Sequence, residues 1–482
     1  MPHLPSSPSS QISDLKSQIS DPSTGPAPAL RRTLGLRQST ALVVGTIIGA
    51  SIFVQPSEIT GSVPSIPGIL LVWLVSGILT LFGALVCAEL ASIFTRTGGV
   101  YIYLKECYSP ALGFLWGWAM FWTMHSGIIA AIAVVFGRYA AYFLPLNDAG
   151  IKAVAILAIL VLSLINFFGV RHGSAVQTWF TIGKLAAILF VVVAGWLLGS
   201  RLPDHFVPAA SAAPVTPGGF FAALIAGLFA FGGWHMVTYN AEETHDPRRT
   251  IPRALLLGVL IVTACYIALN AVYLYVLPLD TVARSSRVAA DAADALLGSG
   301  GAALMSALVI FSTFGALAGI ILAGPRVYYA MAQDGLLFAA FARVHPRYRT
   351  PHLAIALQAV WSSLLVATGT YRALFTRVVF TEWIFFALVA AGLILLRRRA
   401  ARGTGSQPVR DHSTVIPPST APPLSSLHPG YRIWGYPVVP IIFIAACAAI
   451  VVSHIRAQPA DAAIGLALVF AGLPVYYFWA RR

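Results

Sequence analysis

The chain has 482 residues, of which 58% are hydrophobic and only 10% are charged. This composition, with a mean hydropathy of +0.79, excludes a soluble globular protein of this length and indicates a membrane protein with many spans. In such a protein, the formal net charge of +14 at pH 7 indicates basic loops that set the orientation in the membrane, not nucleic-acid binding.

The apolar segments are predicted to be helices, because they run continuously instead of alternating apolar and polar residues as strands of a membrane barrel do. Each is close to the roughly 20 residues that a helix needs to cross a bilayer. Most of the 31 lysines and arginines fall at the two chain ends and in alternate loops, which predicts that both termini are cytoplasmic. The twelve predicted spans are 38–60, 68–94, 112–143, 150–170, 176–199, 219–241, 254–278, 302–332, 353–370, 375–396, 436–455 and 461–480.

This pattern divides the chain into four regions. Residues 1–37 form a Ser/Pro-rich cytoplasmic arm that we expect to be disordered, and they lack the basic start and apolar core of a signal peptide. Residues 38–396 form the core, helices 1 to 10. Residues 397–435 form a Pro/Ser-rich cytoplasmic linker, and residues 436–482 form helices 11 and 12 with a short cytoplasmic end.

Helix 1 contains the segment GTIIGASIF, in which Gly45 and Gly49 interrupt an otherwise apolar run. Each glycine destabilises a helix by about 1 kcal/mol relative to alanine. Helix 6 contains a second interruption at Gly232 and Gly233. One such pair would be explained by close helix packing. Its recurrence five helices later instead predicts two inverted repeats of five helices, the LeuT-like fold, with broken helices 1 and 6 lining a site near the bilayer midplane.

The ends of broken helices suit a zwitterionic ligand. Half-helix N-termini offer unpaired N–H groups and partial positive charge to a carboxylate, and half-helix C-termini offer carbonyl oxygens to an ammonium group. An α-amino acid carries both groups, so it is the predicted ligand.

Four segments carry a resemblance to a known family: VVGTIIGASIFVQP, FAFGGWHMVTYNAEETHDPRRTIPRAL, FSTFGALAGIILAGPRVYYAMAQDGLL and YRIWGYPVVP. They resemble the L-type amino acid transporter branch of the amino acid–polyamine–organocation superfamily, over nearly the whole chain from about Thr40. The resemblance implies an all-helical membrane transporter that exchanges L-amino acids without sodium by alternating access. We expect small neutral amino acids to be the substrates.

The resemblance also implies the residues that bind substrate. Backbone N–H groups of the unwound part of helix 1 would hold the carboxylate, where relatives commonly have Gly-Ser-Gly in place of Gly49-Ala50-Ser51. Carbonyl groups on both broken helices would hold the ammonium group, and Phe229 would cover the bound substrate from outside as a gate. The implied substrate-binding residues are Ile47, Gly49, Ala50, Ser51, Phe229, Gly232 and His235.

His235 departs from the amide or carboxylate that relatives carry at this position. It would face the substrate side chain, and an imidazole titrates near pH 6.5 when unperturbed, so it can make affinity or proton coupling depend on pH. The alternative is a neutral histidine hydrogen-bonded to a neighbour. Either way, a histidine at this place weighs against cationic substrates.

Lys184 is the lysine that lies deepest inside a predicted span, roughly 16 Å from the cytoplasmic end of helix 5 at 1.5 Å per residue. An ionisable group at that depth is expected to be functional. The resemblance implies a tether: the ammonium takes the place of a cation in sodium-coupled relatives and joins broken helix 1 to helix 8, where Ser312 supplies the matching hydroxyl. The alternative is a lysine neutralised by burial.

Charges at the cytoplasmic ends of helices are candidate gate residues. Glu242 and Glu243 end helix 6 and are followed by several arginines, so they form either an inner gate or a solvated helix end. Tyr101, at the start of helix 3, is a further inner-gate candidate. Glu89 in CAEL is expected to pair with a polar group near the inner face.

Two alternatives to exchange stay open. The first is a proton-coupled amino acid or amine transporter in which His235 or a gate carboxylate carries the proton, and the second is an amino acid sensor that does not transport. The chain has no P-loop and no metal-ligand spacing inside its spans, so we expect no enzyme activity, cofactor or metal.

The expected partners are the amino acid substrate and membrane lipid, with no nucleic acid. Eukaryotic members of the branch bind a heavy-chain partner through a cysteine between helices 3 and 4, and the corresponding loop LPLNDAG has none. We therefore expect no covalent heavy-chain partner and a prokaryotic plasma (inner) membrane location.

Overall fold

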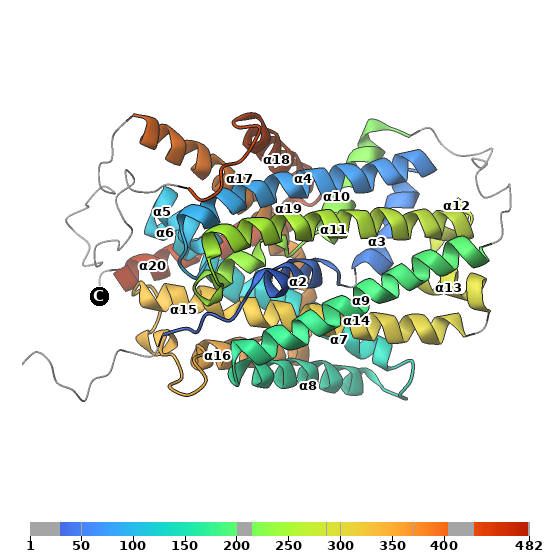
Figure 1. Cartoon of the computed structure of the whole chain (residues 1–482), viewed down its shortest axis with the longest axis horizontal. Coiled ribbons are helices and arrows are strands. Elements are labelled where there is room, and N and C mark those ends of the chain that lie inside the picture. The colour runs from blue at the N-terminus through green and yellow to red at the C-terminus, as the bar shows by residue number, and fades with distance from the viewer. Residues whose placement is uncertain are drawn as a thin grey trace, which may run out of the picture.

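The computed structural model describes residues 29–49, 51–199, 215–285, 287–298, 300–369, 371–402 and 429–480. These residues form helices and one isolated β-bridge, between Leu34 and Thr244. Most helices run along the long axis of the molecule (Figure 1). We call the end that carries α5 and α15, on the left of Figure 1, the α5 end, and the opposite end, which carries α12 and α13, the α12 end.

The elements follow in chain order. They are α2 (Leu36–Ile47), α3 (Ser51–Ser62), α4 (Ile66–Ile93), α5 (Val100–Cys107), α6 (Pro110–Ala119), the π-helix η1 (Met120–Met124), α7 (His125–Ala140), α8 (Asp148–Phe167), α9 (Val170–Leu198), α10 (Pro217–Ala230), the 3-10 helix η3 (Trp234–Glu243), α11 (Pro247–Val276), α12 (Leu279–Arg284), α13 (Val288–Leu297), α14 (Gly301–Ala323), α15 (Pro325–Gln333), the 3-10 helix η4 (Ala339–Ala342), α16 (His352–Thr368), α17 (Tyr371–Ala401), α18 (Val438–Ala457), α19 (Pro459–Phe470) and α20 (Gly472–Ala480).

Ten of the described helical segments are long and apolar enough to cross a membrane. Predicted helix 1 is not among them, because it is divided into α2 and α3, which have 12 residues each. Predicted helix 9 corresponds to α16, an apolar helix of 17 residues. The described part of the chain is thus an all-helical membrane protein, as the composition predicts.

Several boundaries differ from the prediction. Predicted helix 3 is not one continuous α-helix, because η1 inserts a wider π-turn between α6 and α7, and such turns are frequent at functional sites. Two short helices, α12 and α13, occupy the predicted loop between helices 7 and 8. Residues 1–28 of the predicted arm and 403–428 of the predicted linker lie outside the described residues.

The described part of the predicted arm is packed against the bundle. Leu34 is only 1% exposed, and α2 begins at Leu36, two residues before the predicted span. The backbone N–H groups of Thr33 and Leu34 donate to the Glu243 carbonyl at 2.8 and 2.9 Å, and His245 N–H donates to the Leu34 carbonyl at 2.8 Å. The fold therefore begins inside the region that the sequence assigned to the arm.

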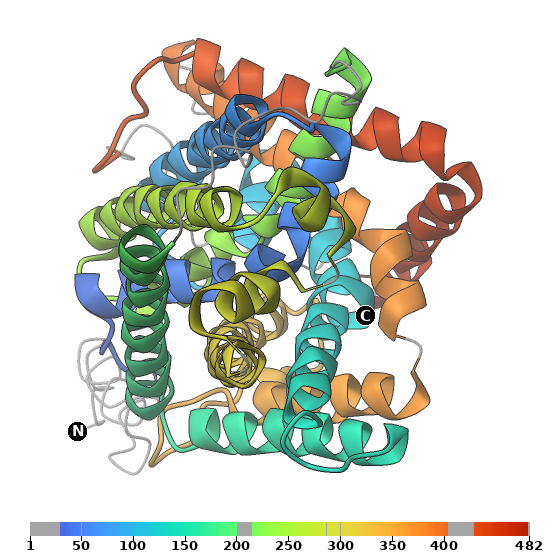
Figure 2. The ribbon, with the colours of Figure 1, turned by 90° about the vertical axis from the view of Figure 1, so that its right-hand side faces the viewer.

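Burial divides the helices into an inner set and an outer set. Figure 2 shows α14 nearly end-on inside the bundle, with α8, α9 and α18 to α20 at its edge. In an apolar stretch of 18 residues from each span, 72% of the residues are buried in the span formed by α14 and α15, but only 22% are buried in α9. The outer helices turn large apolar side chains outward, as expected of helices that face lipid.

Glu89 has polar partners, as the sequence predicts. Its carboxylate accepts hydrogen bonds from Arg397 Nε at 2.7 Å and Nη2 at 2.5 Å, and from the backbone N–H of Ile433 at 2.8 Å. The Arg397 guanidinium also stacks over Tyr436 at 4.0 Å. These contacts tie α4 and α17 to the segment that leads into α18.

Candidate functional site

The break in helix 1 exposes backbone groups of both half-helices. The helix α2 ends at Ile47, Gly49 N–H turns back to the Ile47 carbonyl at 2.8 Å, and α3 begins at Ser51. Ala50 lies outside the described residues. The last carbonyls of α2 and the first N–H groups of α3 have no partners within their own helices, so they are available to a ligand or to neighbouring side chains.

The break in helix 6 lies against the break in helix 1. Gly232 N–H bonds to the Phe229 carbonyl at 3.1 Å, and Gly233 has φ +96°, a conformation that favours glycine. A Cβ atom on Gly233 would lie 3.1 Å from the Thr46 carbonyl oxygen, and the Thr46 hydroxyl is 3.1 Å from the Gly233 carbonyl. The glycine is therefore required both by its backbone angle and by the close approach of helix 1.

Tyr266 on α11 joins the two breaks, and the sequence analysis missed it. Its hydroxyl lies 3.2 Å from the Ile47 carbonyl and 3.0 Å from the Ala230 carbonyl, the ends of α2 and α10. The ring packs edge-on against Trp73 and beside Phe231, at 5.2 and 5.0 Å between centroids. One hydroxyl donates one hydrogen bond, so it satisfies one of the two carbonyls at a time. A tyrosine in the middle of an apolar span was the only sequence signal.

Lys184 on α9 lies behind the helix 1 break and is only 2% exposed. Its Nζ donates to the carbonyls of Gly45 at 3.1 Å, Ile48 at 2.6 Å and Ser312 at 3.1 Å. These three bonds use all three N–H groups of an ammonium. The structure brings Lys184, broken helix 1 and α14 together, and the part they play in transport stays a prediction.

Ser312 adds a second link between α14 and the break. Its hydroxyl lies 3.2 Å from the Gly49 carbonyl and 3.4 Å from the Ile48 carbonyl. The contact of Ser312 with Lys184 runs through the serine carbonyl, whereas the resemblance implied the hydroxyl.

The two breaks together can hold a zwitterion. Two of the carbonyls that the resemblance assigns to the ammonium group, those of Ile47 and Phe229, accept N–H groups of Gly49 and Gly232 in this structure. A carbonyl oxygen has two lone pairs, so the Ile47 carbonyl can accept from an ammonium group when the Tyr266 hydroxyl donates to Ala230 instead. Phe229 is partly exposed at the end of α10, and its role as a cover for the site stays a prediction.

His235 is fully buried just beyond the helix 6 break, within an aromatic enclosure. The rings around it are Trp116, Trp234, Tyr239 and Phe386. Neither ring nitrogen has a hydrogen-bond partner among the described residues. The hydrogen-bonded neighbour that one interpretation of the sequence expected is therefore not found in the described part of the chain.

Glu382 on α17 faces this histidine, and the sequence analysis missed it. Its Oε1 lies 3.7 Å from His235 Nε2, and its side chain is 13% exposed. Its sequence signal is a single carboxylate within the apolar segment VVFTEWIFF. Like the lysine at position 184, an ionisable group inside a span indicates a functional site. Because a carboxylate lies beside His235, the histidine no longer weighs against cationic substrates.

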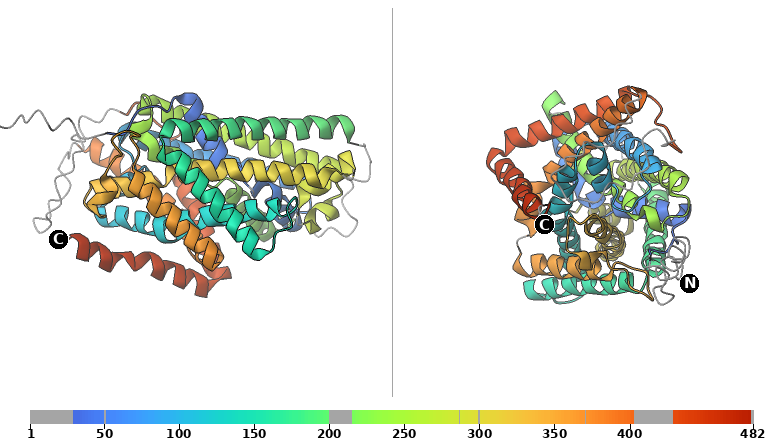
Figure 3. Two further views of the ribbon diagram at one scale, coloured as in Figure 1. Left: turned by 90° about the horizontal axis from the view of Figure 1, so that it is seen from below. Right: turned by 90° about the vertical axis from the view of Figure 1, so that its left-hand side faces the viewer.

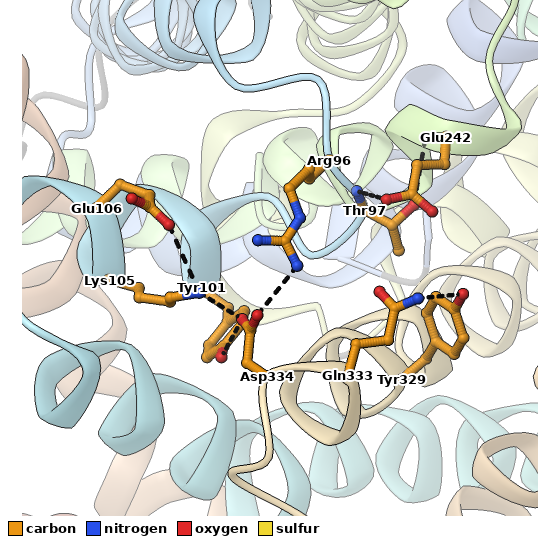
Figure 4. Close-up of polar contacts among 9 residues, drawn as sticks. All are labelled: Arg96, Thr97, Tyr101, Lys105, Glu106, Glu242, Tyr329, Gln333 and Asp334. Atoms are coloured by element: carbon orange, nitrogen blue, oxygen red, sulfur yellow. Dashed lines mark hydrogen bonds and ion pairs between the residues drawn. The ribbon is translucent and has the colours of Figure 1, made fainter. Parts of the chain in front are cut away.

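The candidate gate residues at the α5 end form a network centred on Asp334, which was not predicted (Figure 4). Asp334 follows α15 and accepts from Arg96 at 3.0 Å, from Lys105 at 2.7 Å and from the Tyr101 hydroxyl at 2.8 Å. Glu242 joins the same region, since its carboxylate and its backbone N–H both bond to Thr97. Tyr101 and Glu242 thus both take part in polar contacts at the α5 end, and their role as an inner gate stays a prediction.

Glu243 does not lie at a solvated helix end, so that interpretation is wrong for this residue. Its carboxylate and the Arg326 guanidinium on α15 are both 0% exposed. Two bonds of 2.9 Å join them, from Nε to Oε2 and from Nη2 to Oε1. The exposed arginines after helix 6 are not its partners, and one of them, Arg249, instead lies 3.9 Å from Asp246.

The charge state of Asp334 follows from its neighbours. Burial alone would raise the pKa of its carboxyl, but Lys105, Arg96 and the Tyr101 hydroxyl together hold the pKa below its usual 3.8. A carboxyl with a lowered pKa stabilises the folded state above its unfolded pKa, and that stability is lost only as the pH falls through the lowered value. The Asp334 carboxylate therefore stays ionised to a lower pH than an isolated aspartate does.

We expect Asp334→Asn to loosen the contact between α5 and the end of α15, because Lys105 and Arg96 lose their shared carboxylate. Hydrogen bonds to charged groups contribute about 1.5–3 kcal/mol each, so amide hydrogen exchange in residues 97–107 should accelerate about tenfold or more. The control is Asp246→Asn, which breaks an exposed pair and should change exchange less than twofold. Equal exchange in the two variants would contradict the gate interpretation.

Comparison with known proteins shows a family match over most of the chain. Residues 34–475 match the family model described as amino acid permease. The chain is 33% identical over 456 residues to the serine/threonine exchanger SteT of Bacillus subtilis (strain 168), which covers 94% of this chain and 98% of that protein. It is 32% identical over 374 residues to b(0,+)-type amino acid transporter 1 of Homo sapiens, 77% of each chain. It is 29% identical over 489 residues to large neutral amino acids transporter small subunit 2 of Mus musculus, 98% of this chain and 86% of that protein.

Proposed function

Because the chain belongs to the amino acid permease family and transports amino acids, we propose that it exchanges small neutral L-amino acids across the membrane without sodium. The observation that carries this proposal is Lys184. Its buried ammonium already bonds to carbonyls of α2 and α14, so a fixed positive charge lies behind the substrate site. A transporter whose own lysine ammonium occupies this position does not need a bound sodium ion at the same position.

The size and polarity of the site support small substrates. The aromatic enclosure of His235 limits the space beyond the helix 6 break, since Trp116 and Phe386 lie 5.9 and 4.8 Å from the imidazole, between ring centroids. The similar protein of Bacillus subtilis is named a serine/threonine exchanger, which is consistent with a small polar substrate. In this proposal, the carboxylate binds N–H groups at Gly49 to Ser51 and the ammonium binds carbonyls at Ile47, Phe229 and Gly232.

The proposal includes the architecture that alternating access requires. The broken α2–α3 pair and α16 complete twelve spans, the first ten of which form two inverted LeuT-like repeats. The α5 end faces the cytoplasm of a prokaryotic plasma membrane, the network around Asp334 closes the inner gate, and no covalent heavy chain is needed. Phe229 closes the site from the other side.

A second candidate, proton-coupled transport, is favoured by one observation. His235 and Glu382 lie 3.7 Å apart next to the site, and neither ring nitrogen of the histidine has a hydrogen-bond partner among the described residues. Two titratable groups at this separation can share a proton. Such a pair can release or take up a proton when substrate binds.

Uptake into proteoliposomes separates the two candidates. We expect labelled serine and alanine, and more weakly leucine, to enter only vesicles preloaded with unlabelled amino acid, without sodium and regardless of an inward pH gradient. Uptake into empty vesicles driven by the pH gradient would instead establish proton coupling. In that case Glu382→Gln should abolish the driven uptake while exchange persists, and Glu58→Gln, a carboxylate variant on α3, serves as the matched control.

A further inference from the structure

An exposed group of basic side chains lies at the α5 end, where α8, α9 and α16 meet. Figure 3 shows the start of α16 near the junction of α8 and α9. The group, which we call the basic corner, consists of five exposed residues: Arg171, His172, Arg343, Arg347 and Arg349. None of the ion pairs found among the described residues includes any of these five.

The chain holds the basic corner in a defined shape. The turn between α8 and α9 packs on the loop before α16, because Tyr348 lies between Phe167 and Phe168, with ring centroids 5.7 and 5.3 Å apart. The buried Thr350 hydroxyl donates to the Phe167 carbonyl at 2.9 Å. His345 Nδ1 lies 3.2 Å from the backbone nitrogens of both Arg347 and Tyr348. The loop that carries three of the arginines is thus fixed against the end of α8 and the turn that leads into α9.

The backbone at Arg349 supports a binding function. Its φ is +56°, which is uncommon for residues other than glycine. The conformation persists because Arg349 N–H bonds to the His345 carbonyl, and His345 N–H bonds to the Thr350 carbonyl, at 2.9 Å each. Strained positions of this kind cluster at ligand-binding sites.

The basic corner lies at the boundary of the lipid-facing surface. Two candidate spans meet there, since α8 ends at Phe167 and α9 begins at Val170. Their outward side chains are apolar, with Leu157 59%, Leu164 55% and Trp179 65% exposed. On α16, Val360 is 67% exposed. Arginines directly beside such a surface are placed to meet headgroups while the acyl chains of the same lipids cover the helices.

We propose that the basic corner binds the phosphate of an anionic phospholipid from the surrounding membrane. Guanidinium groups bind phosphate oxygens through paired hydrogen bonds, and the basic corner carries four of them, one in the first turn of α9 and three in the loop before α16. The acyl chains of the bound lipid lie along the exposed apolar faces of α8 and α16, which pack against each other. This site is separate from the substrate site and does not depend on the proposed exchange activity.

The test measures lipid binding to the purified full chain directly. Delipidated protein in a neutral detergent is titrated with phosphatidylglycerol or phosphatidylcholine, and bound lipid is counted by native mass spectrometry. We expect phosphatidylglycerol to bind more tightly, and the triple variant Arg343→Gln/Arg347→Gln/Arg349→Gln to weaken it about a hundredfold, at about fivefold per charge removed. The single variant Arg347→Gln should weaken it about fivefold, so the test holds even if the triple variant does not fold.

A matched triple variant removes the same charge from the same end of the bundle. Arg249→Gln/Arg398→Gln/Arg402→Gln changes three exposed arginines outside the basic corner and should alter binding less than twofold. Equal weakening by both triples would show that the preference reflects the overall charge of this end and would overturn the site. Equal binding of the two lipids would also overturn it. Full displacement by soluble glycerol phosphate would assign the corner to free phosphate instead of lipid.

Discussion

Replacing Lys184 by methionine is expected to lower amino acid exchange at least about a hundredfold while the protein stays folded. The ammonium holds three carbonyls, of Gly45, Ile48 and Ser312, and bonds of a charged donor contribute about 1.5–3 kcal/mol each. Without them, the end of α2 loses its bond to Lys184 of α9, and only the Ser312 hydroxyl still bonds α14 to the break. The geometry of the substrate site then depends on the remaining contacts of the break, and each 1.4 kcal/mol lost from the transition state costs tenfold in rate.

The comparison for Lys184→Met is Lys152→Met, in the same assay. Lys152 also donates to a backbone carbonyl, that of Ala367 at 3.0 Å, but in an exposed position on α8. Exchange in this variant should stay within twofold of the unchanged protein. Methionine retains an unbranched chain of similar length, so loss of packing is small, and Lys184→Ala adds a variant with a cavity. Exchange by Lys184→Met at the unchanged rate would contradict the tether and, with it, the support for sodium independence.

Replacing Arg326 by methionine is expected to give the largest loss of stability. Arg326 and Glu243 are both fully buried and joined by two hydrogen bonds, and a third bond runs from Arg326 Nη1 to the Leu322 carbonyl at 2.6 Å. Removing one partner of such a pair leaves an uncompensated buried charge, which costs about 3–5 kcal/mol. The midpoint of chemical unfolding in detergent should fall accordingly.

The double variant Arg326→Met/Glu243→Met distinguishes the pair from simple loss of packing. When both charges are replaced by apolar groups, no charge remains buried, so much of the lost stability should return. Arg398→Met, at an exposed position, should change the free energy of unfolding by less than about 0.5 kcal/mol. A double variant as unstable as the single one would show that the arginine acts through its shape and its bond to Leu322 alone.

Properties that depend on short segments were accessible from the sequence. Continuous apolar runs of about 20 residues identify a helical membrane protein, because a helix pairs its own backbone groups and then needs an unbroken apolar surface to lie in lipid. The glycines at positions 49 and 232 mark the broken helices, because a local interruption is visible wherever it falls in the chain. Lys184 stood out for the same reason, since a charge in an apolar span is conspicuous without knowledge of its neighbours.

Properties that depend on which helices meet required the tertiary structure. In the sequence, the basic residues nearest to Glu243 are the arginines that follow it. Its partner in the structure is instead Arg326, 83 residues away. A buried carboxylate needs a cation buried at the same place, and only helix packing decides which cation that is. The contacts of Glu382 with His235, of Asp334 with Lys105 and of Tyr266 with Ile47 have the same origin. The sequence by itself determined the membrane class, the breaks and the buried lysine, whereas packing of distant helices decided every ion pair and hydrogen bond that joins them.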